Sequence, residues 1–215
     1  MAVEIKWLGH ASFRISDRYS VVYIDPWKVS PAPRDGNVVL VSHSHHDHCS
    51  PEDVRKVSAD DATIVAPPDT IARLHAPNAI TPGEGWTIRD VTIEAVAAYN
   101  VDKQYHPMTN EWIGAVITVG DVRIYYAGDT DVIPEMSDLT DIDVALLPVG
   151  GTYTLDAAQA AEACRRIGPA HAVPYHWGDI VGSQADAEDF ARQAPCPVTL
   201  LQPGEAMEAP QRGRS

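Results

Sequence analysis

Short apolar stretches separated by turn residues recur along the whole chain and predict many β-strands. These stretches lie at residues 3–8, 12–15, 19–24, 38–41, 63–66, 86–88, 91–96, 112–119, 122–126, 143–148, 171–174, 198–201 and 206–208. The early strands follow one another as meanders, and in the second half helical segments come between them. This order indicates a layered α/β fold. The periodicity alone does not predict the fold in more detail.

Apolar residues at helical spacing and capping residues predict four helices. Three of these lie at residues 51–57, 69–75 and 155–167. Ser50 and Thr154 are expected to cap the first and third of them, because hydroxyl side chains can accept from free amides at a helix start. The last helix is expected to begin after Ser183, which has Asp186 three residues further on.

Length and composition suit one domain. The chain has 215 residues, of which 45% are hydrophobic, and no shift in composition divides it. We therefore expect a single domain at residues 1–209 and a disordered tail at 210–215. No apolar run is long enough to span a membrane, and residues 1–6 do not resemble a signal peptide. With only three cysteines there is no disulfide framework, so a cytoplasmic location is expected.

The net charge of the chain bears on which molecules it can bind. The formal net charge is −14, which repels phosphate backbones and argues against nucleic acid as a substrate. Bound metal ions would still make a site locally positive. We therefore expect a small-molecule substrate, no nucleic acid and no membrane, and the sequence leaves the oligomeric state open.

The densest group of metal-binding side chains lies at residues 43–48, with the sequence HSHHDH. A predicted strand leads into it and a capped helix leads out, so it lies on a short loop. His43 and His45 are two residues apart and can face one metal ion. Asp47 and His48 follow a turn and can face a second. Imidazole and carboxylate groups suit zinc, manganese, iron or nickel without any thiolate.

Three further donors follow predicted strands in the same manner. His106 lies on the loop after residues 91–97, Asp129 follows residues 122–127, and His176 follows residues 171–174. Side chains at strand ends are held by a rigid sheet and can converge along one of its edges. Alternative interpretations are a surface-loop histidine, a turn aspartate and a core histidine, respectively.

The sequence also resembles the metallo-β-lactamase superfamily. Besides HSHHDH, the matching motifs are WLGHA at 7–11, YIDP at 23–26, AGDT at 127–130 and PYHWG at 174–178. Together they are most similar to the compact single-domain branch that includes L-ascorbate-6-phosphate lactonase-like proteins. The resemblance implies a four-layer αββα sandwich of two mixed β-sheets with helices outside.

The same resemblance implies a ligand set for two metal ions. His43, His45 and His106 would hold the first ion, and Asp129 would bridge the two. The remaining ligands of the second ion would be Asp47, His48 and His176.

Three other residues are expected near this centre. The resemblance places His10 close to it, either against the substrate and ligands or as a packing residue. Asp25 can orient a ligand histidine by accepting its other ring N–H, or it can be a turn carboxylate before Pro26. Tyr153 lies on a loop next to the predicted ligands and can line a substrate pocket.

These features predict a metal-dependent hydrolase. Two divalent ions, most simply zinc, would activate a bridging hydroxide, with Asp47 and Asp129 as the catalytic carboxylates. A small lactone or phosphate ester is the expected substrate. The alternatives are a mononuclear iron redox enzyme on the same fold and a metal-stabilised protein without enzymatic activity.

Overall fold

Two mixed β-sheets form the inner layers of the fold. In the computed structural model, which describes residues 2–31 and 33–211, the strand orders are β13-β1-β2-β3-β4-β5-β6 and β12-β11-β10-β9-β8-β7. The strands of the first sheet are β1 (Glu4–Gly9), β2 (Ser12–Ser16), β3 (Val21–Ile24), β4 (Gly36–Leu40), β5 (Ser58–Ala66), β6 (Asn78–Ala79) and β13 (Ala206–Glu208). Those of the second are β7 (Gly85–Ile88), β8 (Val91–Ala97), β9 (Ile113–Val119), β10 (Val122–Tyr126), β11 (Val144–Pro148) and β12 (His171–Tyr175).

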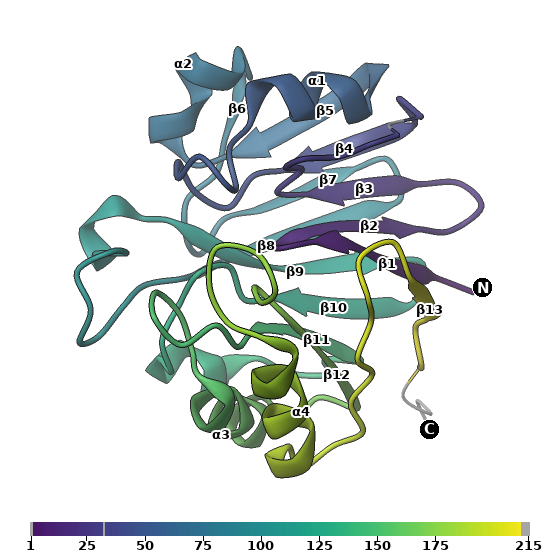
Figure 1. Cartoon of the computed structure of the whole chain (residues 1–215). Helices are drawn as coiled ribbons and strands as arrows, with labels where there is room; N and C mark the ends of the chain where they lie inside the picture. The colour runs from purple at the N-terminus through teal and green to yellow at the C-terminus, as the bar shows by residue number, and fades with distance from the viewer. Residues whose placement is uncertain (1, 32, 212–215) are drawn as a thin grey trace.

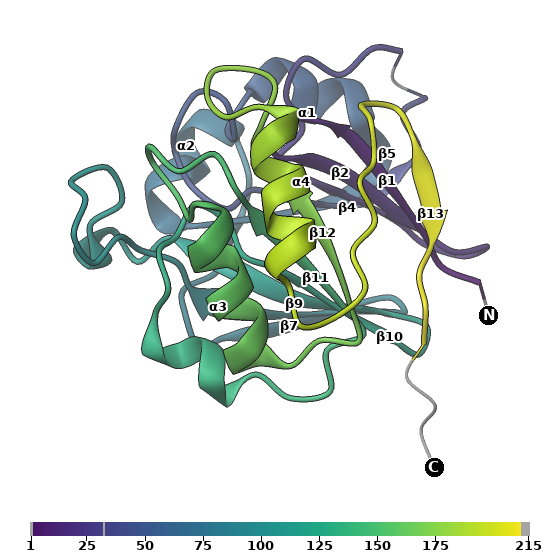
Figure 2. The same cartoon turned by 60° about the horizontal axis from the view of Figure 1, so that its bottom comes forward.

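Helices cover the outer face of each sheet, as Figures 1 and 2 show. The helices are α1 (Pro51–Val57), α2 (Ile71–Leu74), α3 (Ala157–Ile167) and α4 (Gln184–Gln193), with short 3-10 turns at Pro68–Thr70, Met108–Asn110 and Pro134–Asp138. Helices α1 and α2 pack on the first sheet, where Val54 and Val57 meet Val39 of β4 in a small apolar core. Helices α3 and α4 lie against β11 and β12. This arrangement confirms the predicted four-layer sandwich.

The main core fills the space between the two sheets. Alternation along β1 turns Ile5 and Trp7 inward, where both are fully buried. Phe13 of β2 reaches across, with its ring centroid 6.2 Å from that of Tyr126 and 5.5 Å from that of Tyr175. Burying one such large apolar side chain is worth about 1.5–3 kcal/mol. The sheets are therefore a rigid support for the loops at their edges.

Strand direction decides which loops meet. Strands β3, β4 and β5 are parallel, as are β10, β11 and β12. Strand β1 runs with β3 because both are antiparallel to β2, and β8 runs with β10 because both are antiparallel to β9. The loops after β1, β3 and β4 thus leave one edge of the first sheet. Those after β8, β10, β11 and β12 leave one edge of the second.

Most of the predicted elements are present, with differences at several places. The cap of α3 is Asp156, not Thr154: Asp156 accepts from the Gln159 amide at 2.8 Å, and Gln159 Oε1 accepts from the Asp156 amide at 3.0 Å. Residues 198–201 form only one bridge, between Val198 and Ala172, rather than a strand. Strand β5 also begins directly after α1, five residues earlier than its apolar segment suggests.

The caps of α1 and α4 are as predicted. Ser50 accepts from the Asp53 amide at 3.2 Å, and the Ser183 hydroxyl contacts Asp186 at 2.8 Å. Across the described residues, no helix is long and apolar enough to cross a membrane. Part of the expected tail, residues 212–215, lies outside the described residues, and the domain boundary at 209 stays a prediction.

Candidate metal centre

One group of donor atoms lies where the loops after β4 and β8 meet. His43 Nε2 and His45 Nδ1 are 3.1 Å apart, and His106 completes a group whose donor atoms lie within 4.8 Å of one another. Asp129, which follows β10, places its Oδ2 atom 3.3 Å from His106 Nε2 and 3.9 Å from His43 Nε2. The structure therefore brings together all the residues predicted for a first ion.

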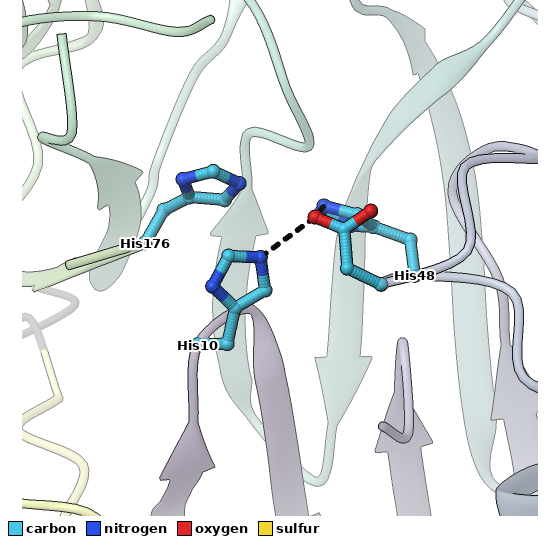
Figure 3. A group of neighbouring side chains, drawn as sticks. His10, His48 and His176 are labelled. Carbon is cyan, nitrogen blue, oxygen red and sulfur yellow. Dashed lines mark hydrogen bonds and ion pairs between the residues drawn. The ribbon is translucent and has the colours of Figure 1, made fainter. Parts of the chain in front are cut away.

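A second group lies beside the first and contains His10, Asp47, His48 and His176. Figure 3 shows the rings of His10, His48 and His176 converging from three separate segments of the chain. Asp129 Oδ1 is 3.4 Å from His48 Nε2, and Asp129 Oδ2 is 3.3 Å from His176 Nε2. Asp47 Oδ2 lies 3.7 Å from His48 Nε2. The carboxylate of Asp129 is therefore shared between the two groups.

The spacing and pairing of these atoms fit divalent metal ions. Two donors at 2.0–2.1 Å from a tetrahedral zinc ion lie about 3.3 Å apart, close to the 3.1–3.4 Å found here. Buried polar atoms normally have hydrogen-bond partners. Among the described residues, those without a partner include His48 Nε2, His106 Nε2, His176 Nε2 and Asp129 Oδ1. Lone pairs that converge in this way suit cations.

Asp25 orients His48. The fully buried Asp25 carboxylate accepts from His48 Nδ1 at 2.7 Å, which leaves Nε2, directed at Asp129, as the nitrogen that can bind a cation. The Ser42 amide and hydroxyl and the Tyr126 hydroxyl also donate to this carboxylate, at 2.7, 2.5 and 2.6 Å. Because these donors occupy both of its oxygens, Asp25 is better suited to positioning His48 than to binding a cation itself.

Two further side chains orient ligands and were not predicted from the sequence. The Ser42 hydroxyl donates to Asp25, so it accepts from His43 Nδ1 at 2.9 Å. Asn100 Oδ1 accepts from His106 Nδ1 at 3.1 Å and from the His106 amide at 3.1 Å. Both contacts leave Nε2 of the histidine as the nitrogen that can bind a metal ion. Ser42 directly precedes the histidine motif, which was the one available signal, whereas nothing local distinguishes Asn100.

His10 holds Asp47. Its Nε2 atom donates to Asp47 Oδ2 at 2.9 Å, the contact drawn as a dashed line in Figure 3. With the proton on that nitrogen, His10 is placed to hold Asp47 rather than to offer Nε2 to a cation. The His10 ring also lies 4.1 Å from the ring of His176, centroid to centroid. Of the two alternatives from the sequence, this geometry favours a residue that positions a ligand.

Burial and charge set the protonation of the donors. Burial, aided by the nearby His48, holds the pKa of His43 well below its ordinary value, so its ring is neutral. For Asp129, burial raises the pKa, but the surrounding His176 and His48 outweigh it and hold the pKa well below its ordinary value. Burial likewise opposes the effect of His10 on Asp47, and the pKa of Asp47 is still lowered. Both carboxylates are therefore ionised and ready to bind cations.

Asp129 and Asp25 raise the pKa of His48. Burial lowers its pKa, but the two carboxylates prevail and hold the pKa well above the ordinary value. A cation at His48 Nε2 has to displace a proton held there. Ion binding should therefore release protons.

The backbone is unusual at several of these positions. His10, Asp25 and His176 all have positive φ angles, of 49°, 42° and 61°. Side chains other than glycine rarely adopt this conformation, and it tends to occur where the surrounding structure demands it for function. Position 150 has to be glycine for a steric reason, because a Cβ atom there would lie 2.5 Å from the His176 carbonyl oxygen. Close packing of backbone thus fixes His176.

The centre opens into a cavity of about 200 Å³. Its lining consists of His45, His46, Asp47, Tyr105, His106, Asp129, Tyr153 and Ile180. Tyr153 therefore lies where a substrate-contacting residue was expected. Cys49, next to the histidine motif, is buried in the small core beside α1, and burial raises the pKa of its thiol to about 11.

Asp25→Asn is expected to weaken metal binding by about 10- to 100-fold, the usual effect of removing a partner that orients a ligand. It also leaves the buried hydroxyls of Ser42 and Tyr126 without a charged acceptor, which should lower the free energy of unfolding by about 1–3 kcal/mol. The measurements are competition with a chelating dye and denaturant unfolding.

Asp35→Asn is the matched control. Asp35 also accepts from a tyrosine hydroxyl, that of Tyr23 at 2.8 Å, and pairs with Arg14, but it contacts no histidine. It should cost stability without changing metal affinity. If Asp25→Asn behaved in the same way, the role of Asp25 would be structural only.

A family model and individual relatives identify the same kind of protein. The model of the β-lactamase superfamily domain matches residues 4–176, which include every predicted ligand. A UPF0173 metal-dependent hydrolase of Aeropyrum pernix is 31% identical over 239 residues, covering 95% of this chain and 97% of that protein. One from Thermococcus kodakarensis is 32% identical over 225 residues, covering 96% and 99%.

A solved structure agrees in fold. A proposed metal-dependent hydrolase of Parabacteroides distasonis is 32% identical, with a TM-score of 0.82, and the match covers 93% of this chain and 94% of that one. The likeness therefore extends over both sheets and the loops that carry the donor atoms.

Proposed function

This chain belongs to the β-lactamase superfamily, among the UPF0173 metal-dependent hydrolases, and on that premise we propose that it hydrolyses a small lactone or phosphate ester at a centre of two divalent ions. The observation that supports two ions is the position of Asp129. Its carboxylate lies 3.4 Å from His48 Nε2 on one side and 3.3 Å from His106 Nε2 on the other. A single carboxylate shared by two donor groups is suited to bridging two cations.

The proposed ligands divide between the two ions. His43, His45 and His106 hold the first, and Asp47, His48 and His176 hold the second. When bound, the two ions supply a shared hydroxide, because they lower the pKa of water from about 15.7 toward 7, and they stabilise negative charge on the substrate oxygen. We propose zinc, since the donors are nitrogen and oxygen in tetrahedral spacing. Manganese, iron and nickel share these ligand preferences.

The residues of the chain have separate tasks in this proposal. Asp129 fixes the separation of the ions and offsets their charge. Asp47, held by His10, presents one oxygen to the second ion and orients the nucleophile. Asp25 and Asn100 keep the rings of His48 and His106 in the form that binds metal.

Two other functions are supported less well. A mononuclear iron redox enzyme on this fold would not need the complete second donor group of Asp47, His48 and His176. A purely structural metal site would be closed, whereas this centre opens into a cavity that can admit a substrate. For the same reason we propose a small-molecule partner and no nucleic acid. The three cysteines are free, which supports the proposed cytoplasmic location.

Purified and reconstituted protein is expected to contain two divalent ions per chain. His106→Ala and His176→Ala should each lose about one ion, because each removes a donor from a different group. His75→Ala is the matched control, since His75 is exposed at the end of α2 and contacts neither group. The measurements are elemental analysis and hydrolysis of panels of lactones and phosphate esters. No more than trace metal in the reconstituted protein would contradict the proposal.

A further inference from the structure

The cavity above the metal centre has a polar floor and a largely apolar rim, to which the exposed His46 also belongs. Asp47, Asp129, His45 and His106 belong to the floor. Tyr105, Tyr153 and Ile180 form the apolar part of the rim, and the rings of the two tyrosines meet edge to face with centroids 4.6 Å apart. A molecule whose reacting group lies at the floor therefore extends past these three side chains.

The apolar rim is more exposed than core side chains are. Tyr105 is 47% exposed and Ile180 is 48% exposed. Among the described residues, the other large hydrophobic side chains that are exposed are Tyr19, Val101 and Met108. Val101 and Met108 lie on the same loop as Tyr105, between β8 and β9. Of these five exposed side chains, Tyr105 and Ile180 line the cavity. Exposed apolar residues at an opening indicate a binding site for an apolar group.

Hydrogen bonds of Asn100 connect the rim of the cavity to its floor. Asn100, which orients His106, donates through Nδ2 to the Tyr153 carbonyl oxygen at 3.0 Å. One buried amide thus fixes both a predicted ligand and the loop that carries Tyr153. Preformed sites of this kind lose little conformational entropy when a ligand binds.

The lining of the cavity contains no lysine or arginine, and its one histidine outside the two donor groups, His46, has Nδ1 3.4 Å from Asp47 Oδ1. The lysine and arginine residues on neighbouring segments have partners: Lys103 pairs with Asp131, Lys28 with Asp179, and Arg73 of α2 donates to the Ser44 carbonyl. A phosphate group that does not itself react at the ions would lose water here without a counterion, which is costly. The net charge of −14 adds to this penalty.

We propose that the substrate is an uncharged lactone carrying an apolar substituent, with the substituent held by Tyr105, Tyr153 and Ile180. This inference rests on the proposed hydrolytic function and selects among its substrates. In the reaction, the oxygen of water bonds to the ring carbonyl carbon, the carbonyl carbon–ring oxygen bond breaks, and that oxygen takes up a proton to give a hydroxy acid. The substituent is unchanged and serves recognition.

The first test compares γ-lactones bearing no substituent with those bearing straight alkyl groups of one to five carbons. Each of the first three methylenes should raise kcat/KM about two- to fourfold, the range for partial to full burial of a methylene. The double variant Tyr105→Ala, Ile180→Ala should reduce this increment to less than about 1.5-fold per methylene. Tyr19→Ala is the matched control, because Tyr19 is an exposed tyrosine on the turn between β2 and β3.

The second test measures binding without turnover. Straight-chain carboxylates from acetate to octanoate resemble the products, and their dissociation constants can be measured by calorimetry. Affinity should rise with chain length in the native protein and in Tyr19→Ala, and should be nearly constant in the double variant. The same dependence on length in all three proteins, or none in any, would overturn the assignment of the rim.

The outcomes distinguish failure of the apolar-lactone proposal from failure of the proposed hydrolytic function. Cleavage of phosphate esters but not lactones, or a preference for a phosphorylated lactone over an alkyl one, would refute the apolar substrate while leaving a metal-dependent hydrolase. Absence of any hydrolysis by protein that holds two ions would refute the proposed function, and the carboxylate series would still decide whether the rim binds apolar chains.

Discussion

Asp129→Ala is expected to abolish hydrolysis while leaving the chain folded. The carboxylate of Asp129 is the group shared by the two donor sets, within 3.4 Å of His48, His106 and His176. Without it, nothing fixes the separation of the ions, and a displacement of about 1 Å can cost about a hundredfold in rate. Loss of the bridging ligand should also release one ion. The rate and the metal content should therefore fall together.

The fold should survive because Asp129 lies on a loop and supports no apolar packing. The measurements are turnover of the substrate that the native protein cleaves, elemental analysis and circular dichroism. Asp138→Ala is the control, an exposed acid on the next 3-10 turn. Asp129→Asn tests charge separately from shape, since it keeps the side chain but not the negative charge. Native turnover with two ions bound in Asp129→Ala would contradict the bridging role.

The elements of the fold were largely predictable because they are local. Alternating or continuous apolar residues mark β1, β4 and β10, and hydroxyl caps mark α1 and α4. The cap of α3 was misplaced because Thr154 and Asp156 are both good caps by type. Only the structure shows that Thr154 is fully buried, with its hydroxyl donating to the Leu155 carbonyl oxygen.

The candidate site was predictable where the chemistry is concentrated in sequence. Residues 43–48 are dense enough in donors to indicate metal on their own, and the resemblance supplied His106, Asp129 and His176. The orienting contacts were harder to predict because they join distant segments. Tyr126 donates to Asp25, 101 residues away, and no spacing rule connects two such positions. Asn100 and the rim residue Tyr105 belong to an irregular loop, where sequence pattern carries little information about side-chain direction.

Removing the metal ions is expected to lower the melting temperature by about 8–16 °C for each site that had been filled. An ion that binds only the folded chain stabilises it by about 4.1 kcal/mol when its concentration is 1,000 times its dissociation constant. In a domain of this size, each kcal/mol shifts the melting temperature by about 2–4 °C. The buried donors support such a coupling, because His48 Nε2, His106 Nε2 and His176 Nε2 have no hydrogen-bond partner among the described residues and can each bind a metal ion.

The experiment is a thermal melt of chelator-treated protein with zinc added back in steps. His176→Ala should show about half of the native gain, because the second donor group loses one of its ligands while the first group stays complete. His75→Ala should show all of it, since its exposed ring takes no part. Equal melting temperatures with and without two bound ions would contradict the prediction. They would mean that the unfolded chain binds the ions as well as the folded one does, or that the donor groups do not hold them.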